Sequence, residues 1–226
     1  MENTIRNNDS VRLVASDLNG TLTTGSPVLA VYRWLIDNQP DSCPPLFKYW
    51  LIISYLQVKV GLKKIDTWGK EAMSAVLNLV QNPDLNMLDE IMEFVVENEL
   101  WPKRRIEPIS LLRELHNKGS EVIIISAAYQ PAVEKFARKI AQVKTSAIGT
   151  PVEITVEGLQ LAGPFNSRDR KMHNLLSAIG SRKLDLALGD TFADIPMLEK
   201  AENAIAVHPD RKLKNKARER GWQIMD

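Results

Sequence analysis

One short stretch, residues 11–24, constrains the fold of this chain more than any other. Its apolar residues form a run typical of a buried β-strand, and the run ends at Asp17. The turn residues Asn19 and Gly20 follow at once. Because side chains alternate along an extended segment, positions 17 and 19 point the same way. The stretch therefore predicts two polar side chains at the carboxyl end of a buried strand, where open α/β sheets bind their ligands.

A pair of acidic residues follows another apolar run near the other end of the chain. The run LDLALG at 184–189 predicts a buried strand that delivers Asp190, and Asp194 lies four residues later, where a loop turns into a helix. Burying unpaired carboxylates is costly, so such a pair is hard to explain as part of a core. The structural alternative is that Asp194 caps the helix while a salt bridge holds Asp190.

Four motifs of the chain resemble those of the haloacid dehalogenase (HAD) superfamily, and they occur in the family's order. The first is DLNGTL at residues 17–22, which matches the family pattern D-x-D-G-T-L except that Asn19 replaces the second Asp. The second is a hydrophobic strand that ends in Ser126, the third is Lys171 at the start of a helix, and the fourth is the acidic pair described above. The resemblance covers both ends of the chain but not the segment between the first two motifs.

Two of these motifs are weak signals when each is taken alone. A serine at the end of a strand, such as Ser126, is often only a turn or cap residue. A single lysine is usually a solvated surface charge, and Arg168 and Arg170 lie close enough in sequence to compete with Lys171 for an anion. The family spacing to the fourth motif favours Lys171.

The resemblance implies an α/β fold, with a Rossmann-like parallel sheet core and an inserted all-helical cap domain. The periodicity agrees, because residues 26–101 contain only helical patterns whereas strands and helices alternate from residue 107 onward. We therefore expect the core to comprise residues 1–25 and 106–226, and the cap to comprise residues 26–105.

The patterns also predict individual elements. Helices are expected at residues 28–37, 46–62, 66–81, 84–98, 108–117, 131–141, 171–179 and 212–220. Strands are expected at residues 11–15, 121–126, 144–148, 152–156, 159–162, 184–189 and 204–207. The fourth and fifth of these form a hairpin around Glu157-Gly158. A short hairpin before the motif lysine resembles the phosphoserine-phosphatase-like branch of the family.

The family's chemistry, carried over to these positions, implies a phosphatase. Asp17 would attack the phosphoryl group and form an aspartyl-phosphate, which divides one difficult displacement into two easier ones. The phosphate-binding residues that the resemblance implies are Ser126, Ala127, Lys171 and Gly20.

The same resemblance implies a magnesium ion, since this hard cation binds carboxylates, carbonyls, waters and phosphate oxygens. Its implied ligands are Asp17, the backbone carbonyl of Asn19, and Asp190, with Asp194 acting through a bound water. The cation and Lys171 would offset the repulsion between an anionic nucleophile and an anionic phosphate.

Asn19 departs from the family pattern at a residue that normally serves as general acid and base. An amide has no titratable proton near neutral pH, so turnover should fall by roughly 10²–10⁴-fold. Three explanations stay open: an engineered replacement, another acid supplied by the protein or by the substrate, or a protein that binds phosphorylated ligands with little catalysis. The alternative function is therefore a catalytically weak binding protein.

Composition and charge exclude several classes of partner. The net charge of +1 gives no general attraction to nucleic acid, and no uncharged stretch is long enough for stable membrane insertion. A single cysteine, Cys43, fits a reducing compartment, and residues 1–10 lack the apolar core of a signal peptide. We expect a cytoplasmic protein, and the oligomeric state is not predicted.

The expected cap contains the most apolar stretch of the chain, residues 46–62. An apolar stripe favours a buried or half-buried cap helix, with a membrane-surface element as the alternative. Family caps close over the site and choose the substrate. Two substrates therefore stay open: a small phosphorylated metabolite, or a lipid phosphate whose tail lies on this stretch. The candidate cap contacts are Arg33, Lys48, Tyr49, Lys63, Lys64 and Trp68.

Overall fold

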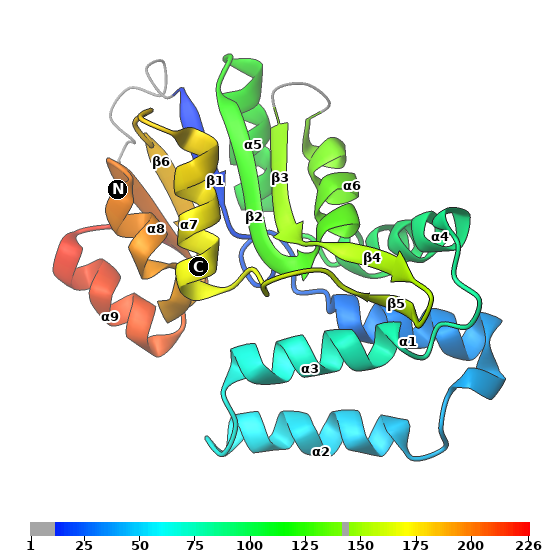
Figure 1. Cartoon of the computed structure of the whole chain (residues 1–226). Helices are drawn as coiled ribbons and strands as arrows, with labels where there is room; N and C mark the ends of the chain where they lie inside the picture. Colours follow the sequence, from blue (N-terminus) through cyan, green and yellow to red (C-terminus); the bar gives the residue numbers. More distant parts are fainter. Residues whose placement is uncertain (1–11, 142–144) are drawn as a thin grey trace.

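The computed structural model describes residues 12–141 and 145–226, and at its centre lies a parallel sheet of six strands (Figure 1). The strand order is β3-β2-β1-β6-β7-β8. The order reverses between β1 and β6, which is where α/β sheets of this kind bind ligands. The strands are β1 (Leu13–Ser16), β2 (Glu121–Tyr129), β3 (Thr145–Thr150), β6 (Leu186–Gly189), β7 (Asn203–Val207) and β8 (Gln223–Met225).

Helices cover both faces of this sheet, because its strands are apolar on both sides. Val14 and Ile124 pack with α5 and α6 on one face, whereas the alternate residues Leu13 and Ile123 pack with α7, α8 and α9 on the other. These helices are α5 (Ile106–Asn117), α6 (Gln130–Ile140), α7 (Arg168–Ile179), α8 (Ile195–Lys200) and α9 (Arg211–Arg220). The Rossmann-like α/β prediction is confirmed.

The segment between β1 and α5 is helical, as the sequence predicts. Ser26 caps its first helix by accepting from the backbone N–H of Leu29, and Pro27 follows it. The segment leaves and rejoins the core at one place, since the backbone N–H of Thr24 donates to Lys103. Its helices are α1 (Pro27–Asn38), α2 (Phe47–Lys59), α3 (Ile65–Leu77) and α4 (Leu85–Val95), with a short 3₁₀ turn at Pro40–Ser42 and a π-helical turn at Val96–Leu100.

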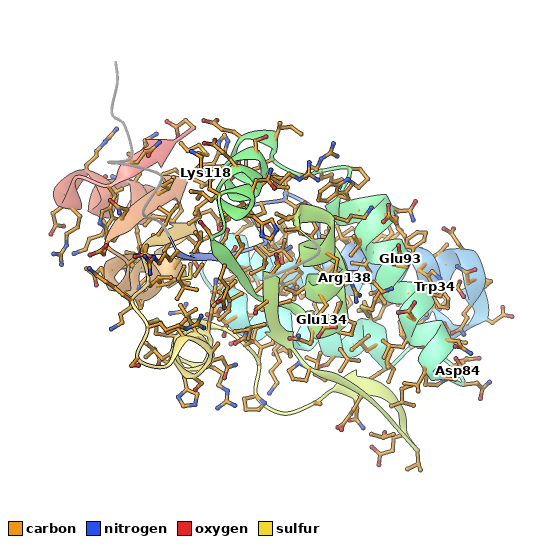
Figure 2. The ribbon with its side chains drawn as sticks, turned by 90° about the horizontal axis from the view of Figure 1, so that it is seen from above. Trp34, Asp84, Glu93, Lys118, Glu134 and Arg138 are labelled. Carbon is orange, nitrogen blue, oxygen red and sulfur yellow. The ribbon has the colours of Figure 1, made fainter. Side chains whose placement is uncertain are left out.

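One helix of this segment, α4, is anchored on the core. Seen from above, α4 with Glu93 lies beside α6 with Glu134 and Arg138 (Figure 2). Lys135 of α6 forms ion pairs with Asp89 and Glu93 of α4, at 2.9 Å each. α4 therefore joins the helical segment to the face of the sheet that α6 covers.

In contrast to α4, which contacts the core, α2 packs against α3 at the outer edge of the molecule (Figure 1). The expectation that residues 46–62 are buried or half-buried is wrong. Only Leu51 and Ser54 of α2 are buried, while most of its large apolar side chains are exposed. A helical periodicity was present, but the sequence does not say how much protein covers the helix. Among the described residues, no helix is both long and apolar enough to cross a membrane.

Most other elements match their predicted positions, with shifted ends. The hairpin around Glu157-Gly158 is present as β4 (Val152–Thr155) and β5 (Gly158–Leu161). β2 continues three residues beyond Ser126, and β8 is a strand that the sequence analysis missed. Residues 1–10, Val11 and Lys144, which the sequence analysis also covers, lie outside the described residues.

Candidate active site

The first, second and fourth motifs meet at the carboxyl ends of three neighbouring strands. Ser16 of β1 pairs in register with Ile124 of β2 and with Leu188 of β6. Because these strands are parallel, the residues that follow at their carboxyl ends lie at one edge of the sheet. These residues are Asp17 after β1 and Asp190 after β6, with Ser126 two residues beyond Ile124. The fold thus brings together three side chains that are distant in the sequence.

The third motif residue, Lys171, lies between two of the carboxylates. Its Nζ is 2.6 Å from Asp17 Oδ1 and 2.7 Å from Asp194 Oδ1, and all three side chains are buried. An ammonium group has three N–H donors. Two of these are directed at the carboxylates, so the third is available for an anion in the site.

Neither arginine that competed with Lys171 reaches this cluster. Arg170 is exposed, and Arg168 forms an ion pair with Asp66 at the start of α3. The structure therefore places Lys171 at the carboxylates, in agreement with the family spacing.

Thr21 links the two strand-end aspartates. Its hydroxyl lies 3.2 Å from Asp17 Oδ2 and 3.0 Å from Asp190 Oδ1. Gly20 has a φ of +96°, and a Cβ added there would lie 2.0 Å from Asp190 Oδ2. Glycine is thus required both by the backbone conformation and by the close approach of the Asp190 carboxylate. The turn NGT brings the backbone against the site.

Asp194 acts both as a cap and as a partner of Lys171. Its Oδ2 accepts from the backbone N–H and the hydroxyl of Thr191, at 3.1 Å each, while its Oδ1 faces Lys171. These bonds complete a capping box at the short 3₁₀ turn Phe192–Asp194, and the side chain makes no cap bond to α8, so the capping half of the structural alternative is correct only for that turn. The other half is wrong, because Asp190 bonds to Thr21 and forms no ion pair among the described contacts.

The concentration of carboxylates perturbs their titration. Burial, with a further contribution from the charge of Asp194, raises the pKa of Asp17 to about 6 although Lys171 opposes the shift. Burial and the charges of Asp17 and Asp194 raise the pKa of Asp190 to about 8. Burial lowers the pKa of Lys171, but the two carboxylates outweigh it and the net pKa is raised. The cluster therefore holds Lys171 as a cation and has an excess of negative charge when its carboxylates ionise.

Asn19 and Ser126 face one another beside this cluster. The Ser126 hydroxyl donates to Asn19 Oδ1 at 3.1 Å, and Asn19 Nδ2 donates to the carbonyl of Gly25 at 3.1 Å. Both ends of the amide are therefore engaged. A side chain at position 19 must carry a proton to make the contact with Gly25, and an amide supplies it permanently.

Asn166 is a residue of this site that the sequence analysis missed. It is fully buried, and its Nδ2 donates to the backbone carbonyl of Ser126 at 2.7 Å. The pairing of β2 with β3 is irregular between Ile125 and Tyr129, which leaves that carbonyl free for a side chain. No periodicity reveals such a residue, because Asn166 lies in the irregular segment between β5 and α7.

A cavity of about 550 Å³ opens over the cluster. Asp17, Asn19, Ser126, Ala127, Lys171, Asp190 and Asp194 all line it, whereas Gly20 does not. From the helical segment only Ile65 and Asp66 reach the cavity, and none of the six candidate cap contacts lines it. The Asp66–Arg168 ion pair therefore stands where the helical segment meets the rim of the cavity.

The donor set suits a divalent cation. Oxygens of Asp17, Asp190 and Asp194 lie within 4.8 Å of one another, and among the described residues this is the one group of three such side chains. Carboxylate oxygens are the ligands that magnesium prefers. A cation there would also oppose the burial and the repulsion by Asp17 and Asp194 that raise the pKa of Asp190.

Comparison with known proteins agrees with this geometry. A family model for haloacid dehalogenase-like hydrolases matches residues 14–199, which include all four motifs. The chain belongs to this hydrolase family. It is 31% identical over 229 residues to the phosphoserine phosphatase SerB1 of Mycobacterium tuberculosis, a match that covers 93% of this chain and 69% of that protein. The predicted family and its phosphoserine-phosphatase-like branch are confirmed.

Solved structures agree at the level of the fold. A protein of unknown function from Bordetella pertussis Tohama I superposes with a TM-score of 0.77 at 18% identity, covering 96% of this chain and 99% of that one. A substrate-bound phosphoserine phosphatase gives a TM-score of 0.62 at 16% identity, covering 96% and 93%. The HAD-like architecture therefore extends over nearly the whole chain.

Proposed function

We propose that this HAD-like hydrolase is a magnesium-dependent phosphomonoesterase that acts through an aspartyl-phosphate on Asp17. The observation that carries the proposal is the position of Asp17, at the end of β1, 2.6 Å from Lys171 and on the wall of the cavity. A carboxylate beside a fixed cation is a suitable nucleophile for phosphate, because the cation offsets the repulsion between two anions. The relatedness to SerB1 supports the same class of reaction.

The chain's own residues supply most of what the reaction needs. A carboxylate oxygen of Asp17 forms a bond to phosphorus while the bond from phosphorus to the alcohol oxygen breaks, and the alkoxide takes a proton from water. Lys171 holds a phosphoryl oxygen with its third N–H, and Ser126 holds another after turning away from Asn19. Water then attacks phosphorus, releases inorganic phosphate and restores the Asp17 carboxylate.

The residues present fit a magnesium ion held by Asp17, by the backbone carbonyl of Asn19 and by Asp190. When bound, the cation offsets negative charge on the carboxylates and on the phosphate. Asp194 differs from Asp17 in that its Oδ2 accepts from two backbone N–H groups and the Thr191 hydroxyl while its Oδ1 faces Lys171, so we assign it to holding Lys171 and to positioning a water of the cation.

Asn19 makes this a slow enzyme. It places an amide where the acid and base of the reaction would stand, so neither the departing alkoxide nor the attacking water receives help from this position. The aspartyl-phosphate should therefore persist longer than in a relative with Asp there. The second candidate function, a protein that binds a phosphorylated ligand with little turnover, rests on the same residue.

For the substrate, we propose a phosphorylated metabolite or a lipid phosphate, selected by a cap that comprises residues 26–105 on a core of residues 1–25 and 106–226. Ile65 and Asp66 are the only residues of this cap on the cavity wall in the described chain, so selectivity should depend on them. Phosphoserine is the phosphate ester that the name of SerB1 gives, so it is the first metabolite to test.

The test is hydrolysis of an aryl phosphate and of phosphoserine with magnesium or with a chelator, together with trapping of the intermediate. We expect slow turnover that needs magnesium and disappears in Asp17→Asn, and a protein-bound phosphate that hydroxylamine releases, as expected for an acyl phosphate. Asp169→Asn, which changes an exposed carboxylate of α7, is the matched control and should keep full activity. Phosphate binding without any phosphoenzyme would favour the binding protein, and activity that survives in Asp17→Asn would overturn the mechanism.

A further inference from the structure

We propose that α2 docks on the surface of an anionic lipid bilayer. Its solvent-facing stripe, called here the α2 face, comprises Leu46, Tyr49, Ile53, Leu56 and Val60. These positions are three or four residues apart, so they form one continuous face of the helix. Each is between 53% and 71% exposed. Water-soluble monomers rarely expose a contiguous apolar surface of this kind, and where they do it marks a binding site.

The exposure of the α2 face is set by packing on the other side of the helix. Leu51 and Ser54 are buried against the protein, and Ser54 Oγ accepts from the Trp68 ring nitrogen of α3 at 3.0 Å. The rings of Tyr55 and Trp68 lie 5.0 Å apart. These contacts fix the rotation of α2, so the apolar stripe points away from the molecule.

The charges around α2 indicate an anionic partner. Residues 46–64 contain four lysines and no acidic residue, and one of the lysines, Lys63, forms an ion pair with Glu71 of α3. Lys48, Lys59 and Lys64 are exposed, and Lys59 lies 5.3 Å from the centre of the Tyr55 ring. Apolar residues on one face with lysines beside them, and with Trp and Tyr among them, are typical of helices that lie in the interface of an anionic bilayer.

A basic helix elsewhere in the chain provides an internal comparison. α9 carries more basic residues than α2, but Lys214, Lys216 and Arg220 form ion pairs with acidic residues, and its apolar residues Leu213 and Ala217 are buried. Basic charge alone therefore does not single out α2. What distinguishes α2 is that exposed apolar side chains and lysines occur together.

A second copy of the chain fits the α2 face less well than a bilayer does. Two α2 faces packed on one another would bring six exposed lysines close together, namely Lys48, Lys59 and Lys64 of each copy, without an acidic residue from either stretch. A bilayer supplies both the apolar interior and the negative head groups. α2 has 13 residues, so it is too short to span the hydrocarbon layer of about 30 Å and would lie along its surface.

This docking goes beyond the proposed hydrolysis and does not depend on it. The two are nevertheless adjacent in the chain, because the turn after α2 leads directly to Ile65 and Asp66 on the cavity wall.

The test is co-sedimentation of the full chain with vesicles of phosphatidylcholine alone and of phosphatidylcholine with phosphatidylglycerol. We expect binding to the mixed vesicles that weakens with salt, and little binding to the neutral ones. The variant Ile53→Glu/Leu56→Glu should lower the binding by at least about tenfold, since it places two charges in the apolar layer. Lys48→Gln/Lys59→Gln should lower it by a smaller factor and remove most of the salt dependence.

Two controls separate the α2 face from general effects. Leu85→Glu changes an apolar residue that is 76% exposed on α4, and Lys200→Gln/Lys214→Gln removes two positive charges elsewhere. Both should bind mixed vesicles like the parent, and circular dichroism should show that every variant is folded. Equal binding to neutral and anionic vesicles, equal binding by the Ile53→Glu/Leu56→Glu variant, or a dimer in lipid-free solution that this variant dissociates would each overturn the proposal.

Discussion

The carboxylate cluster and the α2 face depart from the usual arrangement of a folded protein in opposite ways. In the cluster, Asp17, Lys171 and Asp194 are charged groups inside the protein. On the α2 face, large apolar groups such as Ile53 and Leu56 lie in water. Buried charge costs stability, and apolar surface that stays in water contributes none. Each is therefore a place where the chain is built for something other than its own folding.

The two regions differ in how far other parts of the protein compensate for the buried charge or for the exposed apolar surface. Inside the cluster, Lys171 pairs with two carboxylates and Thr21 bridges two, so protein partners satisfy most of the polar atoms. What remains is an excess of negative charge, which a cation and not a side chain would neutralise. The α2 face has no protein cover in the described chain, so its compensation must come entirely from outside. A buried site can thus be argued in detail from its own atoms, whereas a surface site is defined by its partner.

The largest expected effect concerns position 19, where the proposed mechanism lacks a general acid and base. Asn19→Asp should raise turnover by roughly 10²–10⁴-fold, because it restores a group that can give and take a proton. The contact with the carbonyl of Gly25 requires a proton on side chain 19, so it should favour the neutral acid of the new Asp. Steady-state hydrolysis of an aryl phosphate with magnesium measures the change.

Asn19→Ala is the matched control, since it removes the amide without adding an acid. It should leave turnover at or below that of the parent. If both variants rose equally, the amide would be blocking the site instead of lacking a proton. If neither variant changed turnover, position 19 would not limit the reaction.

The next effect compares the two sides of α2. Leu51→Ala should cost about 2–5 kcal/mol of unfolding free energy, because Leu51 is buried between α2 and the protein. Ile53→Ala, two residues away on the α2 face, should change it by no more than about 0.5 kcal/mol. Denaturant unfolding measures both values. Similar small costs for the two variants would mean that α2 is only loosely attached, and the fixed orientation of the α2 face would then be lost.

Sequence reasoning succeeded where chemistry and periodicity coincide. Asp17 and Asp190 each follow a short apolar run and precede a turn. The sequence therefore predicts which strand carries each aspartate, and that the aspartate lies at the carboxyl end of that strand. The fold then had little freedom, because neighbouring parallel strands bring their carboxyl ends together. Lys171 was identified only through the family resemblance. Its contact with two carboxylates now explains physically why a cation stands at this position.

Sequence reasoning failed where the outcome depends on tertiary cover. The apolar residues of α2 have a helical period, and the period cannot tell a buried stripe from one that faces solvent. Asn166 carries no local pattern at all, and its importance comes from a carbonyl that an irregular strand leaves unpaired. β8 is only three residues long, which is too short for an alternation to stand out.

The smallest expected effect is the dependence of the protein's folding stability on pH. It tests whether the cluster carries an excess of negative charge. In the folded protein the pKa of Asp17 is raised to about 6 and that of Asp190 to about 8, both above the ordinary 3.8. Between 3.8 and these values the folded state binds more protons than the unfolded state, so stability falls as pH rises. Without a divalent cation, Tm should therefore decrease from about pH 6 to about pH 8, where Asp190 still titrates.

Magnesium should reverse this decrease, because a ligand that binds only the folded state raises its stability. Asp190→Asn should be less sensitive both to pH in that interval and to magnesium, since an amide neither titrates nor attracts the cation as strongly. Asp37→Asn, at an exposed carboxylate of α1, should keep both responses. Thermal scans at the two pH values, with magnesium or with a chelator, decide the matter. A pH slope that survives in Asp190→Asn would show that the excess negative charge lies elsewhere, and a cation bound at these aspartates would then lose its main electrostatic support.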